Sequence, residues 1–260
     1  MASGVAARLF RSGFRNLVML EVEQPLAVRR TVSFCEAVYD GRATVEDLAS
    51  ELAPDVSAVP GILRAGRIPV LVDPEHHSRR VLAPEVVVDA VLAKVNLHTR
   101  PDDAPLVVGL GPGFTAGEDC RVVVETNRGH DLGRLIFSGE AEPNTGIPGD
   151  IAGRSRERVL RAPRTGTVTG ALPIGTLVRS GDEVCRVGGL PVRAAIDGML
   201  RGMIREGLSV PAEIKIGDVD PRGEKARFVT ISEKARALGG AVLEAVCAHF
   251  SGSLPGGTAR

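Results

Sequence analysis

The chain has 260 residues, 43% of them hydrophobic, and its 32 lysines and arginines balance 32 aspartates and glutamates. This length suits one large or two ordinary domains, and the lack of net charge gives no reason to expect a nucleic acid or an anionic membrane as a partner. No apolar run is long enough to span a bilayer, and we do not expect a Sec-type signal.

Residues 1–155 alternate helical and β-strand patterns, which predicts a Rossmann-like α/β domain with a parallel sheet. Helical spacing of apolar residues predicts a helix at 2–12, and a capping pattern predicts a short helix at 44–52. Residues 84–95 are expected to form a strand followed by a helix. Short apolar runs predict further strands at 16–22, 68–72, 106–110, 121–125 and 135–137. The glycine- and proline-rich stretch 139–153 is expected to be an ordered loop or a connector between domains.

Residues 161–187 and 193–219 form an internal repeat in which 7 of 27 aligned pairs are identical at an offset of 32 positions. Each copy has short β-type runs separated by glycine turns, and neither can bury its apolar face alone. Residues 156–227 are therefore predicted to form a small pseudo-two-fold β-barrel or sandwich. This segment looks like the biotinyl/lipoyl barrel family, but the hairpin at 187–191 has no lysine. Carriage of biotin or lipoate is not expected.

The chain is expected to end in a helix and a short disordered tail. Apolar side chains share one helical face from Ser232 onward, which predicts a helix within residues 228–250 that packs back on the protein. Gly239 and Gly240 each cost this helix about 1 kcal/mol relative to alanine, so packing must hold it. Residues 251–260 are predicted to be disordered.

Glycines crowd the segment that follows the predicted strand 106–110. They are Gly109, Gly111, Gly113 and Gly117. Their missing side chains would let backbone amides approach an anion, Thr115 would add a hydroxyl donor, and a helix starting after the loop would add its dipole. On this reading the loop binds a phosphate or a nucleotide. The alternative is that these glycines only form a tight turn at the edge of the sheet.

A second candidate for nucleotide binding lies near the start of the chain. In dinucleotide-binding folds a glycine turn precedes the first helix, and an acidic residue about 20 positions later contacts the ribose. Gly4 and Glu21 match the last glycine and this acid, but the first strand and the leading glycines are missing. The chain therefore begins late or has another fold, with an ordinary amphipathic helix and strand. The adjacent Arg29 and Arg30 would grip a phosphate or a carboxylate, unless they are simply solvated.

The segment 126–131 (TNRGHD) offers weak candidates for catalysis and cofactor binding. His130 titrates near neutral pH and Asp131 adds a carboxylate, so both are candidate acid–base groups. Asn127 and Arg128 would supply hydrogen-bond donors to a cofactor.

The four cysteines are widely spaced, which suits reduced thiols and excludes a zinc knuckle or a disulfide scaffold. Cys120 would be a reactive thiolate if a helix end or Arg128 lowered its pKa, with a buried structural cysteine as the alternative. His76 and His77 lie close to Asp73, but no third ligand stands at helical spacing. We expect a polar turn there and no metal site.

Seven runs that together cover nearly the whole chain resemble one family. They are ASGVAARLFRSGF (2–14), QPLAVRRTVSFCEAVYDG (24–41), VVVDAVLAKVNLHT (86–99), GLGPGFTAGEDC (109–120), VVETNRGHDLGR (123–134), EPNTGIPGDI (142–151) and VPAEIKIGDVDPRG (210–223). On these runs the chain resembles the selenium-dependent molybdenum hydroxylase accessory proteins, or YqeB family. Two departures are the lack of the apolar strand and Gly-x-Gly-Asp turn expected before residues 2–14, and His98 in place of glycine in the N-L-G-T pattern.

The resemblance implies a bacterial, cytoplasmic accessory protein that serves molybdenum hydroxylases through cofactor maturation or selenium insertion. Its partners would be hydroxylase subunits or other maturation factors, and self-association stays open. Its ligand would be a nucleotide, NAD(P) or molybdopterin cytosine dinucleotide, held by Gly111, Gly113, Thr115 and the loop of Arg29 and Arg30. Two alternatives stay open: an NAD(P)-dependent oxidoreductase using His130 or Cys120, and a non-catalytic docking protein for a hydroxylase.

Overall fold

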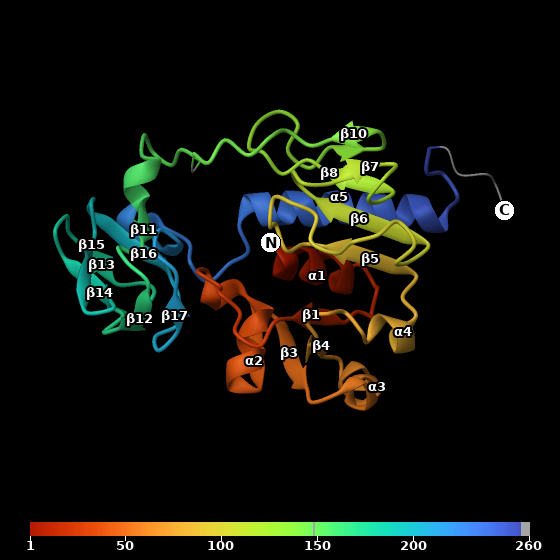
Figure 1. Cartoon of the computed structure of the whole chain (residues 1–260), viewed down its shortest axis with the longest axis horizontal. Helices are drawn as coiled ribbons and strands as arrows, with labels where there is room; N and C mark the ends of the chain where they lie inside the picture. The colour runs from red at the N-terminus through yellow and green to blue at the C-terminus, as the bar shows by residue number, and fades with distance from the viewer. Residues whose placement is uncertain (148, 256–260) are drawn as a thin grey trace. The chain divides into compact units, whose positions relative to one another are not determined.

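The computed structural model describes residues 1–147 and 149–255, and it divides the chain into two compact units. The first unit contains Met1–Leu20, Ala53–Thr145 and the segment that begins at Ile231, and the second contains Glu21–Leu52 and Gly146–Thr230 (Figure 1). The sequence predicts a first domain over 1–155, whereas the structure groups residues 21–52 with the repeat. Each unit is thus built from segments that are distant in the sequence.

A four-stranded sheet forms the centre of the first unit. Its strands are β5 (Val86–Asp89), β6 (Leu106–Leu110), β8 (Val122–Val124) and β9 (Leu135–Ile136), in this order. β5, β6 and β8 are parallel, and β9 is antiparallel to β8. This confirms the prediction of a mixed α/β fold with a parallel sheet. Alternate side chains point to opposite faces, which explains why β6 is buried at every position.

Two helices cover one face of this sheet, α1 (Ala2–Arg11) and α5 (Glu233–Phe250). They pack along each other (Figure 1). Ser232 caps α5, since its hydroxyl accepts a hydrogen bond from the Ala235 amide at 3.3 Å. The predicted C-terminal helix is confirmed, and glycines allow its close contact with α1. A Cβ atom on Gly239 would lie 2.8 Å from the carbonyl oxygen of Gly4.

Irregular segments cover the opposite face of the sheet. Phe114, Ala116 and Cys120 pack there against Val107 and Val123, and the two-stranded pair β7 (Thr115–Ala116) and β10 (Gly139–Glu140) lies in the same layer. Neither the link from β5 to β6 nor that from β6 to β8 contains an α-helix. The expected helices after the glycine loop and after residue 89 are therefore wrong, and the crossover helices of a Rossmann fold are missing from these two links.

The rest of the first unit is built from short elements around a second apolar cluster. Ile62 and Leu71 lie in this cluster. Strand β1 neighbours strand β4 in the sheet order. The elements are β1 (Met19–Glu21), η3 (Val56–Ala58), α3 (Val59–Arg64), β4 (Ile68–Val72) and α4 (Arg79–Leu82). No helix among the described residues combines the length and apolar character needed to cross a membrane.

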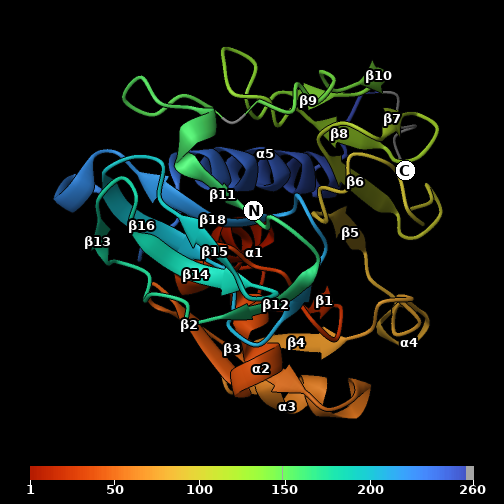
Figure 2. The same ribbon diagram turned by 60° about the vertical axis from the view of Figure 1, so that its left-hand side comes forward.

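The second unit contains two four-stranded antiparallel sheets, most of whose strands are labelled in Figure 2. Their strand orders are β11-β18-β16-β13 and β15-β14-β12-β17. The strands are β11 (Val159–Arg161), β12 (Gly166–Thr169), β13 (Leu177–Val178), β14 (Glu183–Val187), β15 (Leu190–Arg193), β16 (Gly198–Met203), β17 (Ser209–Val210) and β18 (Lys215–Asp220). Buried aliphatic side chains from both sheets form one core. Shifting β11–β14 by 32 positions places them on β15–β18 and exchanges the two sheets. The sequence repeat is therefore a structural repeat, in which each copy contributes two strands to each sheet.

Segment 21–52 belongs to this unit and contains η1 (Arg30–Val32), η2 (Phe34–Glu36), α2 (Ala37–Asp40) and the strands β2 (Arg42–Val45) and β3 (Leu48–Ala53). The helix predicted at 44–52 is wrong, because this stretch forms the β2–β3 hairpin. Val45 pairs with Leu48 across a two-residue turn in which Glu46 has a φ of 57°. The residues read as a helix cap from Thr44 thus shape a turn instead.

The predicted disordered tail falls partly outside the described residues, which end at 255. Before that point, Ser251 and Ser253 donate backbone hydrogen bonds to the last turn of α5. The η4 (Arg156–Arg158) and η5 (Gly223–Lys225) turns flank the repeat.

Candidate ligand-binding site

The best candidate site lies in the first unit, at the carboxyl edge of the parallel strands. β5 ends at Asp89, β6 runs into the glycine loop, and β8 runs into Glu125 and Thr126. Because parallel strands end at the same edge, their following residues gather there, and this edge is the usual ligand position in open α/β sheets. A cavity of about 430 Å³ opens in the segment after β5. It is lined by Asn96, Leu97, His98, Thr99, Arg100 and Asp119.

Hydrogen bonds around Asn96 hold the wall of this cavity. The Asn96 side-chain amide donates to Asp119 Oδ1 at 2.8 Å and to the Thr99 carbonyl at 2.9 Å, and its oxygen accepts the Thr99 amide at 2.9 Å. The Thr99 hydroxyl donates to Asp89 Oδ2 at 2.6 Å. Asp119 Oδ2 accepts the Thr115 amide at 2.8 Å. The segment 96–99 is thus tied to the end of β5 and to the loop after β6.

The groups left open in the cavity are basic and apolar side chains. His98 and Arg100 are exposed, and Leu97 is 52% exposed. A guanidinium and an imidazole suit acidic groups of a ligand, and Leu97 offers an apolar surface for a ring. Sequence reasoning did not select these residues as a site, although the run 86–99 and His98 had been singled out in the family resemblance.

The glycine loop does not offer the open backbone that the sequence suggests. A Cβ atom on Gly109 would lie 2.6 Å from the Phe114 ring, and one on Gly113 would lie 2.6 Å from the backbone of Lys94 and Val95. The space beside Gly111 is filled by the Thr126 side chain. These glycines permit close packing within the protein, which corrects the prediction that they admit an anion.

Several donors of this loop are also engaged. The Gly111 amide donates to the Val124 carbonyl at 2.9 Å, and the Gly117 amide donates to the Cys120 carbonyl at 2.8 Å. The Thr115 hydroxyl donates to Glu140 at 3.2 Å. The alternative reading of a tight turn at the sheet edge describes these contacts better.

The other predicted nucleotide-binding residues make contacts within the protein. Gly4 lies inside α1, where a Cβ atom would lie 2.8 Å from Ala235 Cβ, so it serves helix packing. Glu21 lies at the end of β1, in the segment grouped with the second unit, and burial raises the pKa of its carboxyl. Arg29 and Arg30 donate to backbone carbonyls of the second unit, to Arg227 at 3.4 Å and to Met203 at 2.9 Å. They are therefore not simply solvated.

The predicted loop 126–131 is tied to its surroundings by acidic groups. The Asn127 amide donates to the buried Glu125 carboxylate at 2.6 Å, and the Asn127 side chain bonds Glu142. Arg128 pairs with Glu233 in the first turn of α5. His130 is exposed, and Asp131 pairs with Arg134 at 2.8 Å. No catalytic geometry is apparent among these described groups.

Cys120 is unsuited to nucleophilic chemistry in this structure. Its side chain is 1% exposed, and burial raises the pKa of the thiol to about 11. Lys234, which sequence reasoning did not select, lies near Arg128 and Glu125; burial and the Arg128 charge lower the pKa of its ammonium. No three histidine, cysteine, aspartate or glutamate side chains gather as metal ligands within residues 1–147 and 149–255.

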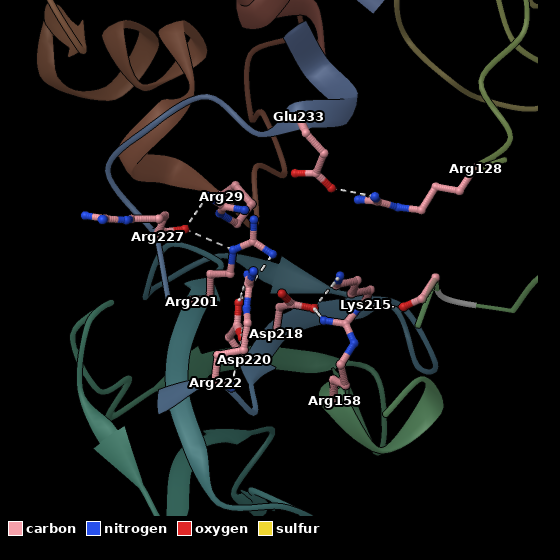
Figure 3. A network of polar contacts seen from close by, with 11 residues as sticks. Arg29, Arg128, Arg158, Arg201, Lys215, Asp218, Asp220, Arg222, Arg227 and Glu233 are labelled. Atoms are coloured by element: carbon pink, nitrogen blue, oxygen red, sulfur yellow. Dashed lines mark hydrogen bonds and ion pairs between the residues drawn. The ribbon is translucent and has the colours of Figure 1, made fainter. Parts of the chain in front are cut away.

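The second unit contains buried charges on β18 that the sequence analysis also did not select. Asp218 is 4% exposed and lies between Arg158 Nη1 at 3.0 Å and Lys215 Nζ at 3.1 Å (Figure 3). Because buried carboxylates are costly unless paired, these contacts account for its position.

Asp220, two residues further along β18, is fully buried and pairs with Arg222 at 2.7 Å and Arg201 at 3.6 Å (Figure 3). Arg201 also donates to the Arg227 carbonyl at 3.1 Å. These charges connect the sheet to the segment after β18. In the sequence, the alternating pattern D-V-D at residues 218–220 is the feature that could have indicated these charged side chains.

No family model matches the chain. Two solved structures show partial likeness, the ectoine utilization protein EutE (DoeB) from Ruegeria pomeroyi at 19% identity and an aspartoacylase family protein from Mesorhizobium loti at 14%. They cover 32% and 33% of this chain and 27% of each of their own, and with TM-scores of 0.23 they carry no argument.

One curated relative is similar over most of the chain. It is the uncharacterized protein YqeB of Escherichia coli (strain K12), which is 50% identical over 246 residues, or 95% of this chain. The match covers 45% of YqeB, so the chain spans about half the length of the relative that it matches. The chain is therefore similar, over nearly all of its own length, to under half of a longer protein whose name states no activity.

Proposed function

We propose that the chain is a YqeB-family protein that serves the maturation of selenium-dependent molybdenum hydroxylases by binding a nucleotide-like or molybdopterin-type cofactor. The family resemblance supplies the biological role. The observation that carries the binding proposal is the cavity of about 430 Å³ at the carboxyl edge of the parallel sheet. Its volume falls within the range of about 300–1,000 Å³ typical of small-molecule sites.

The lining of the cavity suits the parts of such a ligand. Arg100 and His98 would bind a phosphate group, and Leu97 would contact the base or the pterin ring. Asp119 already accepts one hydrogen bond on each oxygen, yet a carboxylate has further lone pairs for ring N–H donors. The binding site is thereby proposed at residues 96–100 and 119 rather than at the glycines.

The partner would be a hydroxylase subunit or another maturation factor in the cytoplasm. The second unit would serve as a structural or docking module. Its sequence looks like that of biotinyl/lipoyl domains, but its β14–β15 hairpin has no lysine. An NAD(P)-dependent oxidoreductase gains no support from Cys120, whose thiol is buried and protonated, or from the filled glycine loop.

A non-catalytic docking protein is the second candidate, and a specific observation favours it. The segment beside the cavity exposes three aliphatic side chains, Val91 at 62%, Val95 at 58% and Leu97 at 52%. Exposed apolar side chains that cluster are typical of protein contact surfaces. Binding of a hydroxylase without any affinity for a nucleotide would identify this second function.

Titration calorimetry with cytidine diphosphate tests the binding proposal, since this probe carries the nucleotide part of the dinucleotide cofactor. We expect binding to weaken about ten-fold or more in Arg100→Ala, because a charge-assisted hydrogen bond is lost. Arg64→Ala removes the same charge from an exposed position outside the cavity and should bind as the wild type does. Equal affinity of Arg100→Ala and Arg64→Ala, or no binding at millimolar probe, would contradict the proposed site.

A further inference from the structure

A second cavity, of about 230 Å³, lies on the internal two-fold axis of the second unit. It is lined by residues 159–161 and 163 of the first copy of the repeat and by residues 191–193 and 195 of the second copy. Each residue of the first set lies 32 positions before its counterpart in the second, which is the offset of the repeat. The cavity is therefore bounded by the same four positions of both copies.

Arg161 and Arg193 are the equivalent arginines of this cavity, and they are the one identical polar pair in the repeat. The other identical pairs are glycine, alanine or valine. The alanines and valines lie in the core, where burial explains their identity. Both arginines are exposed, so core packing does not explain theirs.

The two guanidinium groups are held in equivalent ways. Arg161 Nη1 donates to the Glu213 carbonyl at 2.6 Å, and Arg193 Nη1 donates to the Gly181 carbonyl at 2.9 Å. Glu213 and Gly181 are again 32 positions apart. Each arginine thus bonds one nitrogen to a turn of the protein. Arg161 keeps the rest of its fork for other partners, whereas Arg193 Nη2 also bonds Glu183.

The charges around the two arginines differ. Arg193 lies across the strands from Glu183, whose Oε2 is 3.2 Å from Arg193 Nη2. At the equivalent place Arg161 lies across from Lys215. In the described part of the chain, Arg161 has no carboxylate within ion-pair distance. Like charges opposite each other destabilise a strand pair, and an anion at Arg161 would relieve this.

The edge of the unit disfavours an added peptide strand as the ligand. Among the described strands, β11 pairs only with β18 and β15 only with β14, so both strands lie at the edges of their sheets. Pro163 and Pro191 line it and have no N–H to donate to an incoming strand. The arginine side chains are the charged donors among the residues that line this cavity.

We propose that this two-fold cavity binds a small anion with an acidic group at each end, with one end on Arg161 and the other on Arg193. Two guanidiniums related by an internal two-fold axis match a ligand with two similar acidic ends better than a monoanion. A diphosphate and a dicarboxylate share this chemistry. The site lies in the second unit and is independent of the nucleotide site proposed above.

Calorimetry at low ionic strength tests the site with two pairs of probes, pyrophosphate against phosphate and succinate against acetate. All measurements use the 260-residue protein carrying Arg100→Ala, to reduce binding at the first cavity. We expect one two-ended probe to bind at least ten-fold more tightly than its one-ended counterpart, and the pair in which this occurs identifies the acidic group. Salt should weaken this binding, because the site is exposed.

Arg161→Ala and Arg193→Ala should each weaken the binding by about ten-fold, whereas the matched charge removal Arg64→Ala should leave it unchanged. The variant with both Arg161→Lys and Arg193→Lys keeps the charges but loses the forks, and should bind with intermediate affinity. Circular dichroism verifies that each variant is folded. No binding of either two-ended probe, equal binding of one-ended probes, or an effect of only one of the two arginines would overturn the proposal.

Discussion

Two adjacent glycines in α5, Gly239 and Gly240, allow the contribution of the α1–α5 contact to the free energy of unfolding to be measured. A Cβ atom on Gly239 would lie 2.8 Å from the Gly4 carbonyl oxygen and 2.9 Å from Arg8 Cβ, whereas one on Gly240 would meet nothing within 4 Å. Both changes to alanine raise helix propensity by about 1 kcal/mol. Only the change at Gly239 forces the two helices apart, and such overpacking costs about 1–3 kcal/mol.

We therefore expect Gly240→Ala to raise the free energy of unfolding by up to about 1 kcal/mol, and Gly239→Ala to lie about 1–3 kcal/mol below Gly240→Ala. Denaturant unfolding followed by circular dichroism at 222 nm measures this difference, because α1 and α5, the longest helices described, both belong to the first unit. Gly4→Ala should also be destabilising, since its Cβ atom would lie 2.8 Å from Ala235 Cβ.

The double variant Gly4→Ala with Gly239→Ala should lose less stability than the sum of the single losses, because one separation of the helices relieves both contacts. Equal stability of Gly239→Ala and Gly240→Ala would refute the close packing of α1 on α5. It would also mean that helix packing does not explain the glycine at position 4.

Three further outcomes follow from the structure. Gly113→Val should lower the free energy of unfolding of the first unit by about 1–3 kcal/mol or more in the same assay. Gly113 has a φ of +105°, and the Lys94–Val95 backbone occupies the space that a side chain would need. A variant as stable as the wild type would show that the loop is open. Burial by itself raises the pKa of Asp220, but hydrogen bonds from Arg222 outweigh this effect and lower the pKa. The ionised Asp220 therefore stabilises the fold at a pH above about 4, the pKa of an aspartate in the unfolded chain. This stabilisation is lost as the pH falls below that value and the folded protein takes up the proton. Unfolding at pH 7 and pH 3 should show a smaller change in Asp220→Asn than in the wild type, and equal changes would count against this pairing. A thiol reagent at pH 8 should label only Cys247 in the native protein. The other three cysteines (Cys35, Cys120 and Cys185) are buried, and burial raises the pKa of each of their thiols to about 11 or 12. Label found on Cys120 by mass spectrometry would contradict this prediction.

The elements that the sequence predicted well are those with a local signal. The apolar runs at 68–72 and 106–110 form β4 and β6, because a strand buried on both faces is apolar at every position. The helix after Ser232 has both a cap and an apolar face, and it forms as α5. The prediction was wrong for the hairpin β2–β3, because the turn at Glu46 and Asp47 contains the same kinds of polar residue as the start of a helix.

The candidate site depended on contacts that no local pattern reports. Gly109, Gly111 and Gly113 have the composition of an anion loop, but Phe114, Thr126 and the Lys94–Val95 backbone fill the space before them. The cavity residues 96–100 meet Asp119 only because β5 and β6 are parallel neighbours that end at one edge. Asn96 therefore becomes part of a site through partners in the loops after two strands.

The sequence by itself determined the parallel strands of the first unit, its C-terminal helix and the repeat of the second unit, because periodicity and self-similarity are properties of the order of residues. Only the tertiary structure decided which segments share a unit, which glycines are filled by neighbours and which arginines face a cavity. Residues 21–52 join the repeat, and Arg161 and Arg193 line one cavity, through contacts between residues far apart in the chain. Such contacts depend on the burial and pairing of whole elements, and no single stretch of sequence contains them.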